Sequence, residues 1–272
     1  MTATLPHATY RPVPDVRVTV RGAVDTGTAD YAAARIAELI TDDALPVLAA
    51  RVRLTRYWEV AVTGPVIAQT NVDIDGWFVR AQASAPTGPD AVDRAVERLR
   101  ERVVRVAELR GAGWGDKLRH SVRGRHELTI QRMVGAHRSV RSPSTIRTKR
   151  CLPVVCSVSD AAFDMDIRDY NFHLFTERES GRDSVLWRDG SGGTRLTQGS
   201  PSDRHRSRPA QDPVISGALD APVISLSTAE HRLGAGRLPF IPFVDIDTKN
   251  VSVLYRRYDG HFGLLTALPA TR

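Results

Sequence analysis

An internal repeat constrains the fold of this chain of 272 residues more than any other feature of its sequence. The segment HLFTERESGRDSVLWR (173–188) aligns without gaps with IPFVDIDTKNVSVLYR (241–256), and SVSDAA (157–162) aligns with SLSTAE (225–230) at the same offset in residue number, which we call the repeat offset. The matched pairs in the longer window are Phe175 and Phe243, Ser184 and Ser252, Val185 and Val253, Leu186 and Leu254, Trp187 and Tyr255, and Arg188 and Arg256. One offset shared by two separate segments indicates a duplicated structural unit.

Each copy of the repeat predicts a strand, a short helix and then a hairpin of two strands. We expect the copies at residues 147–198 and 213–268 of a C-terminal domain that spans 147–272, with a polar, mobile connector over 189–213. The copies are predicted to pair with each other as a pseudo-dimer. The side chains expected to mediate this pairing are Phe175, Val185, Trp187, Phe243, Val253 and Tyr255.

The helix of each copy has a recognisable start. Ser157 and Asp160 have the spacing of a capping box, and so do Ser227 and Glu230 in the second copy. The first helix also carries three carboxylates, which are interpreted as a solvated face: Asp164, Asp166 and Asp169.

Residues 15–110 predict a separate α+β domain with the order β-α-β-β-β-α, a topology like that of double-stranded-RNA-binding domains. VRVTVRG alternates apolar and polar residues as a half-buried strand does, and a helix and three further strands follow, the last two joined by a tight turn at Asp75 and Gly76. PDAVDRAVERLRERVVRVAELR then predicts a long helix over 89–110. Residues 1–14 are expected to form a flexible tail.

The long helix has two opposed faces. Its apolar residues recur at helical spacing and predict a buried stripe: Val92, Val96, Leu99, Val103 and Val106. Arg94, Arg98, Arg102 and Arg105 fall within an arc of roughly 80° on the other side, where guanidinium groups could bind phosphates. The alternative is a solvated face that Glu97, Glu101 and Glu108 neutralise.

The charge of the chain points to an acidic partner. A net charge of +7 and a pI near 9.9 favour nucleic acid or an anionic membrane surface. Residues 111–146 predict a basic, flexible linker that could follow a nucleic-acid groove, and the alternative is a solvated spacer.

Enzymatic chemistry is not indicated by any motif in the sequence. No nucleophile with its base, metal cluster or phosphate-binding loop has a diagnostic spacing, so no catalytic site, metal or cofactor is predicted. Cys151 and Cys156 are interpreted as core residues, and Asp73 and Asp75 as solvent-facing strand acids. Without an apolar block at the N-terminus, a cytoplasmic location is expected.

Several segments together resemble the long form of the bacterial ribosome hibernation-promoting factors. They are DAVDRAVERLRERV (90–103), IRTKR (146–150), HLFTERESG (173–181) and LYRRYDGHFGLL (254–265). The doubled second domain resembles the actinobacterial dormancy or hypoxia type. This resemblance implies a factor that binds the decoding region of the small ribosomal subunit, contacts 16S rRNA and small-subunit proteins, and blocks mRNA and tRNA at the A and P sites. It implies no small-molecule substrate and no membrane.

The residues expected to contact RNA combine the long helix, the linker and two strand positions where the family tends to be basic. They are Arg21, Arg80, Arg94, Arg98, Arg102, Arg105, Lys117, Arg119, Arg123, Arg125, Arg132 and Arg138. Arg98 matches the family pattern directly. The order of acidic and basic residues differs from that pattern at Arg100, Glu101 and Arg102, so their individual contacts are not inferred from it.

The duplication also bears on assembly. Single-copy relatives dimerise through this second domain and thereby join two ribosomes. Two copies on one chain have an effective concentration of order mM for each other, so we expect intramolecular pairing, no homodimer and single inactive 70S particles. The alternatives are a ribosome-dimerising (100S) factor of the same family and a nucleic-acid-binding modulator of transcription or of a sigma factor. Membrane binding is disfavoured because the apolar face of the long helix lacks Trp and Phe.

Overall fold

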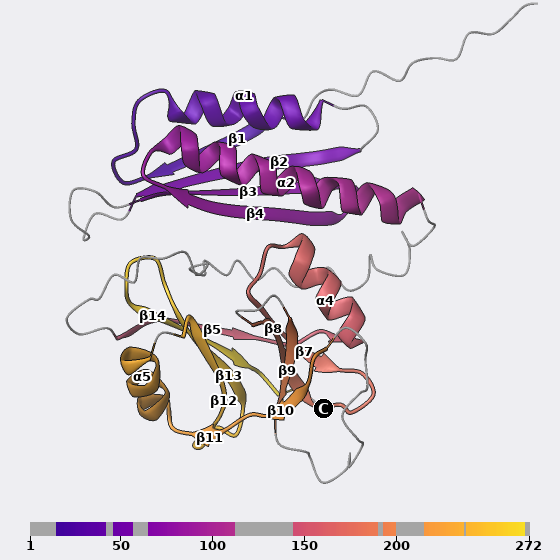
Figure 1. Cartoon of the computed structure of the whole chain (residues 1–272), viewed down its shortest axis with the longest axis vertical. Helices are drawn as coiled ribbons and strands as arrows, with labels where there is room; N and C mark the ends of the chain where they lie inside the picture. The colour runs from indigo at the N-terminus through magenta and orange to yellow at the C-terminus, as the bar shows by residue number, and fades with distance from the viewer. Residues whose placement is uncertain are drawn as a thin grey trace, which may run out of the picture.

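The computed structural model describes residues 15–41, 46–56, 65–111, 144–189, 193–199, 215–236 and 238–269. Its N-terminal part is one sheet with two helices on the same face, and its C-terminal part consists of two sheets, each with one helix (Figure 1). The predicted tail at 1–14 and most of the predicted linker lie outside the described residues.

The N-terminal elements confirm the predicted order β-α-β-β-β-α. They are β1 (Val16–Arg21), α1 (Thr28–Ile40), β2 (Val47–Arg56), β3 (Val66–Ile74), β4 (Trp77–Ala85) and α2 (Gly88–Gly111). The strand order is β1-β2-β3-β4, with β1 parallel to β2 and the other neighbours antiparallel. Asp75 and Gly76 form the predicted tight turn with φ of 51° and 89°, the left-handed geometry that a two-residue hairpin loop requires.

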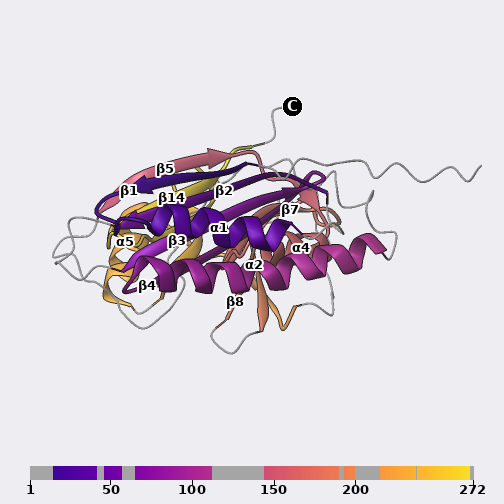
Figure 2. The same ribbon diagram turned by 90° about the horizontal axis from the view of Figure 1, so that it is seen from above.

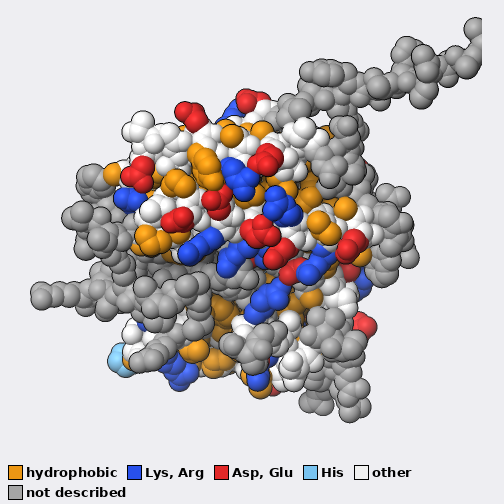
Figure 3. All heavy atoms as spheres, turned by 45° about the horizontal axis from the view of Figure 1, so that its top comes forward, with side chains coloured by type: hydrophobic (Ala, Val, Ile, Leu, Met, Phe, Trp, Pro, Cys, Tyr) orange, Lys and Arg blue, Asp and Glu red, His pale blue; other side chains and the backbone are white. Residues whose placement is uncertain are grey.

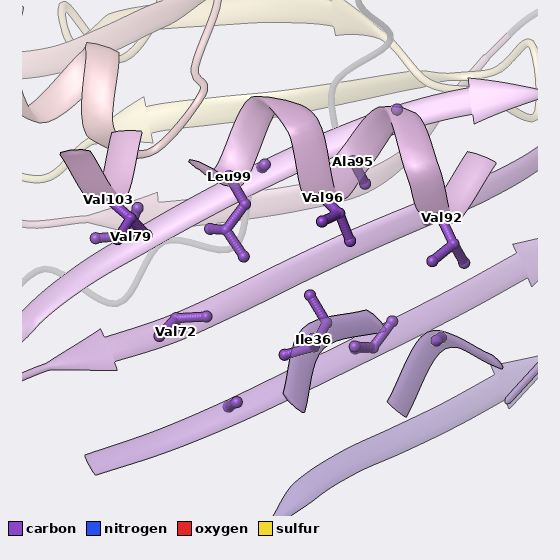
Figure 4. Packing of buried hydrophobic residues seen from close by; sticks show 14 of the residues in the cluster. Ile36, Val72, Val79, Val92, Ala95, Val96, Leu99 and Val103 are labelled. Carbon is purple, nitrogen blue, oxygen red and sulfur yellow. The ribbon is translucent and has the colours of Figure 1, made fainter. Parts of the chain in front are cut away.

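Both helices cover one face of this sheet (Figure 2). The five apolar residues predicted for α2 are all buried: Val92, Val96, Leu99, Val103 and Val106. They meet Ile36 of α1 and the strand residues Val72 and Val79 in one apolar cluster (Figure 4). In the strand order β4 is one edge of the sheet, and α2 packs over its inner face.

The C-terminal part repeats one series of elements. The first copy has β5 (Thr145–Cys151), β6 (Val155–Cys156), α4 (Val158–Ile167), β7 (Phe172–Glu177), β8 (Asp183–Arg188) and β9 (Thr194–Gln198). The second has β10 (Ala218–Asp220), β11 (Val223–Ile224), α5 (Leu226–Ala235), β12 (Phe240–Asp245), β13 (Val251–Arg256) and β14 (Phe262–Ala267). The bounds of α4, β7 and β8 recur at the repeat offset in α5, β12 and β13.

The two copies exchange their first strands. One sheet has the order β10-β9-β8-β7-β6 and the other the order β11-β12-β13-β14-β5. Strand β5 of the first copy is parallel to β14 of the second, and β10 of the second copy is parallel to β9 of the first. Glu230 of α5 supports this arrangement, because its carboxylate accepts hydrogen bonds from the N–H and hydroxyl of Thr145.

Aromatic residues related by the repeat meet between the two sheets. The rings of Phe172 and Phe240, which correspond at the repeat offset, have centroids 5.0 Å apart. Phe172 lies 6.0 Å from Tyr255, and Phe240 lies 5.9 Å from Trp187, the counterpart of Tyr255. Equivalent residues contact each other, and the contact of Phe172 with Tyr255 has its symmetry-related counterpart in that of Phe240 with Trp187. This pattern indicates an approximate twofold axis between the copies.

Several predictions for the C-terminal part need correction. Residues 194–198, expected to lie in the connector, form strand β9, so each copy ends in three antiparallel strands instead of two. Ser157 caps α4 with the predicted capping box, but Ser225 is the N-cap of α5 instead of Ser227. Phe243 packs beneath α5 within its own copy, in a cluster apart from that of the other five predicted pairing residues.

Candidate nucleic-acid interface

The predicted row of arginines on α2 does not face solvent along its whole length. Arg94 is exposed, and its Nη1 lies 3.4 Å from the carbonyl oxygen of Ser84. The half-buried Arg98 donates from Nη1 to the carbonyl of Gln82 at 2.8 Å. Both arginines thus reach the edge of the sheet at β4.

The C-terminal half of the row is occupied by the first repeat. Arg102 is buried and donates from Nη2 to Oδ1 of Asp169 at 2.7 Å and from Nε to the carbonyl of Asp166 at 2.9 Å. Arg105 forms an ion pair with the carboxylate of Asp166. The interpretation of Asp164, Asp166 and Asp169 as a solvated face is therefore wrong, because Asp164 and Asp169 are buried and Asp166 is paired with arginine.

Arg80 is also buried, on the face of β4 opposite the helices. Its Nη1 donates to the carbonyl of Arg168 at 3.1 Å, and its guanidinium carbon lies 5.3 Å from the ring centre of Tyr170. The prediction that Arg80 and Arg102 present their charges to RNA is thus not met in this conformation. The reason is that the segment after α4, residues 166–170, packs against Arg80 of β4 and Arg102 of α2.

On β1 and β2, the face of the sheet away from the helices carries three arginines that were not predicted to contact RNA: Arg17, Arg51 and Arg53. Arg17 and Arg51 lie directly opposite each other on β1 and β2, and Arg53 lies opposite Thr19. Because side chains alternate along a strand and Val18 and Val52 point into the core, these arginines lie on the face away from the helices, with the predicted Arg21. We call Arg17, Arg21, Arg51 and Arg53 the sheet arginines.

The face of the sheet away from the helices differs from the helical face in how its charges are arranged. Like charges directly opposite on neighbouring strands destabilise a sheet, so Arg17 and Arg51 repel each other unless an anion lies between them. Arg17, Arg21 and Arg51 are exposed, and Arg53 is half-buried. On the helical face, arginines are interspersed with Asp and Glu (Figure 3), as in the pairs Arg35–Asp93 and Arg100–Glu97 at 3.1 and 2.8 Å.

The strand pattern contained the signal for the sheet arginines. VRVTVR and AARVRLTR both alternate, so the same period that predicted the strands also placed their arginines on one face. Six of the predicted RNA-binding residues cannot be compared in this way, because they lie outside the described residues: Lys117, Arg119, Arg123, Arg125, Arg132 and Arg138.

Metal binding and membrane insertion find little support in the described part of the chain. Among the residues described, no group of three or more His, Cys, Asp or Glu side chains could hold a metal ion, and no helix is long and apolar enough to cross a membrane. Asp73 accepts a hydrogen bond from the N–H of Gly76 at 2.8 Å and so stabilises the turn that follows it. Cys151 and Cys156 are buried free thiols.

Comparison with known proteins defines the class to which this fold belongs. The model of the Sigma 54 modulation/S30EA ribosomal protein C terminus matches residues 141–196 and 217–264, which cover the two repeats. Over 263 residues the chain is 32% identical to a protein described as a dormancy associated translation inhibitor in two strains of Mycobacterium tuberculosis. That match covers 94% of this chain and 89% of the relative. The chain therefore belongs to the Sigma 54 modulation/S30EA ribosomal protein family and has that family's C-terminal domain.

Two solved structures match the N-terminal part. The N-terminal domain of Thermus thermophilus Protein Y is 26% identical, with a TM-score of 0.28 and coverage of 34% of this chain and 98% of that domain. A ribosomal subunit interface protein from Coxiella burnetii is 14% identical, with a TM-score of 0.28 and coverage of 34% and 94%.

Proposed function

We propose that this protein is a ribosome hibernation factor that inhibits translation during stress or dormancy. In this proposal it binds the small subunit at the decoding region, lies along 16S rRNA and blocks mRNA and tRNA at the A and P sites. Membership of the S30EA family and the 32% identity to a dormancy associated translation inhibitor support the class of function. The cluster of sheet arginines on the face away from the helices is the observation that carries the RNA contact.

The sheet arginines suit a structured RNA backbone better than a particular base sequence. Guanidinium groups bind phosphate oxygens through two parallel hydrogen bonds, and phosphate contacts fix orientation without reading bases. The sheet holds the arginines at fixed spacings, because Arg17 and Arg51 are neighbours across two paired strands. Folded rRNA presents phosphates at comparably fixed positions, so the proposed recognition is of shape and charge.

Co-sedimentation with purified small subunits at several salt concentrations tests the RNA contact. We expect binding to weaken steeply with salt, and each of the variants Arg17→Ala, Arg21→Ala and Arg51→Ala to flatten the log–log salt slope by roughly one unit. Arg100→Ala is the matched control, because Arg100 is paired with Glu97 on the helical face. Equal slopes for all four variants and the parent protein would contradict binding through the sheet face.

The exchange of strands within one chain supports 70S particles over ribosome dimers. Strand β5 completes the sheet of the second copy and β10 completes that of the first, so each copy already has a partner in the same chain. A second chain could exchange strands in the same way only by displacing β5 or β10 against an effective concentration of order mM. We infer that the two copies of one chain pair with each other as the C-terminal domains of two chains would in a dimer. One bound chain would then not join two ribosomes.

Sucrose-gradient sedimentation of ribosomes with the purified protein separates the two outcomes. We expect the protein to migrate with 70S particles at every protein concentration. A 100S peak that grows with protein concentration would favour the alternative, a ribosome-dimerising factor. Retention on duplex DNA without binding to ribosomes would favour the transcriptional alternative.

A further inference from the structure

Helix α4 of the first repeat docks against α2 and β4 of the N-terminal domain (Figure 1). The centre of this contact is apolar. The rings of Trp77 and Phe163 meet edge to face with centroids 5.5 Å apart, and Ile167 is fully buried within the core cluster of the N-terminal domain. Burial of a side chain in the core of another domain indicates a formed interface and not a chance approach.

The polar part of the contact is centred on Asp169, directly after α4. Its Oδ1 accepts from Nη2 of Arg102 at 2.7 Å, and its Oδ2 accepts from the backbone N–H of Gln82 at 2.8 Å. Nη1 of Arg98 lies 3.9 Å from the same Oδ2. The Asp169 side chain is only 1% exposed, so this charge is almost fully removed from water and held by donors of the N-terminal domain.

The rest of the turn supplies further acceptors to arginines of the N-terminal domain. Asp166 binds Arg105 through its carboxylate and Arg102 through its carbonyl, and the carbonyl of Arg168 binds Arg80. The C-terminal end of a helix also carries a partial negative charge. The turn thus offers carboxylate and carbonyl oxygens to four guanidinium groups. An RNA backbone would offer phosphate oxygens, which accept hydrogen bonds from guanidinium groups in the same way.

The acidic turn belongs to the first repeat alone. At the repeat offset its contact residues Phe163, Asp166 and Asp169 correspond in the sequence to His231, Gly234 and Arg237. The second copy therefore builds the same helix and sheet without this turn. The fold of a repeat thus does not require these side chains. Asp166 also pairs with Arg188 of its own copy at 2.7 Å, whereas Asp169 is held by donors of the N-terminal domain.

We propose that the turn of α4 is an internal competitor of RNA for the arginines at the α2–β4 edge, an inference that rests on the function proposed above. In the docked conformation the turn holds Arg80, Arg98, Arg102 and Arg105, and full engagement of RNA requires the turn to leave. The apparent dissociation constant then equals the intrinsic constant divided by the fraction of undocked protein. Weaker docking gives tighter binding to the ribosome.

The variant Asp169→Asn in the full chain tests this competition. Asn tolerates the φ of +53° at this position, so the turn keeps its conformation. The amide oxygen of the new Asn side chain can accept from either the N–H of Gln82 or Nη2 of Arg102, and its NH2 group then faces the other donor. We expect the dissociation constant for small subunits to fall about tenfold, since a hydrogen bond to a charged group contributes about that factor or more. Asp247→Asn is the matched control, because Asp247 is exposed on the second repeat and the charge change is the same.

Amide hydrogen exchange of the full chain provides a second readout. In the ribosome-free protein, Asp169→Asn should speed exchange in β4, where the N–H of Gln82 loses its acceptor, and Asp247→Asn should not. On binding of small subunits to the parent protein, α4 should exchange faster while α2 is protected. If α4 stays protected in the bound state, the turn does not leave and the inference is wrong.

The outcomes also separate this inference from the proposed function. Tight, salt-sensitive binding by the parent protein with no gain in Asp169→Asn would overturn the competition and leave ribosome binding intact. Absence of binding by the parent protein and both variants would overturn the proposed function and the inference with it.

Discussion

Arg182 binds the exchanged strand β10 to the sheet of the first repeat. Replacing its side chain tests how much this contact contributes to the stability of the C-terminal part. Its Nε donates to the carbonyl of Gly199, just after β9, at 2.7 Å, and Nη2 donates to the same carbonyl. Nη2 also lies 2.6 Å from Oδ1 of Asp220, the last residue of β10. One buried guanidinium thus binds two strands that come from different copies of the repeat.

The magnitude follows from the burial of the two partners. Arg182→Ala leaves the buried carbonyl of Gly199 without these donors, which costs about 1–3 kcal/mol, and with the lost packing of the side chain we expect about 2–4 kcal/mol in all. The carboxylate of Asp220 is 81% exposed, so its ion pair contributes at most about 1 kcal/mol. Asp220→Asn should therefore be nearly neutral.

Urea unfolding, followed by circular dichroism and by tryptophan fluorescence, measures both variants. Arg182→Ala should shift the midpoint of the C-terminal transition to clearly lower urea, and Asp220→Asn should leave it almost unchanged. Equal losses in the two variants would mean that the exposed ion pair, and not the buried carbonyl, stabilises the exchange. A loss below about 0.5 kcal/mol for Arg182→Ala would refute the role of this residue altogether.

Three further predictions concern the C-terminal part. Burial raises the pKa of Glu177, but hydrogen bonds from the turn that follows it more than offset this, and the pKa of Glu177 is lowered. The ionised carboxylate therefore stabilises the fold above its usual pKa, and this stabilisation is lost as the pH falls through the lowered pKa. Glu177→Gln should flatten the loss of stability below about pH 4.5 in acid titrations. Burial raises the pKa of Cys151 to about 11 and that of Cys156 to about 12, so near pH 8 a thiol reagent should label them only as fast as the protein unfolds, and fast labelling of native protein would contradict this. A methyl group on Gly263 would overlap the ring of Tyr255, so Gly263→Ala should lower the free energy of unfolding by about 1–3 kcal/mol in urea titrations.

The sequence predicted those parts of the fold that depend on local periodicity or on the repeat. The stripe from Val92 to Val106 and the turn at Asp75 have a local signal, the two copies are revealed by their shared offset, and the structure contains each of them. The exchange of β5 and β10 has no such signal. A strand that pairs within its own copy and one that pairs with the other copy have the same pattern of apolar residues.

The candidate site was predictable only in part. The sheet arginines follow from the alternation that also predicted strands β1 and β2, so they could have been identified from the sequence. The burial of Arg102 could not, because its partner Asp169 lies far along the chain, beyond the linker. Charged residues on an amphipathic helix have the same spacing whether they face water, RNA or another domain.

Cell-free translation with a titration of the purified protein tests whether the protein inhibits ribosomes. We expect protein synthesis to stop when the protein reaches stoichiometry with ribosomes. Raised salt and the triple variant Arg17→Ala, Arg21→Ala, Arg51→Ala should each relieve the inhibition. Translation at full rate with the protein in clear excess over ribosomes would contradict the account.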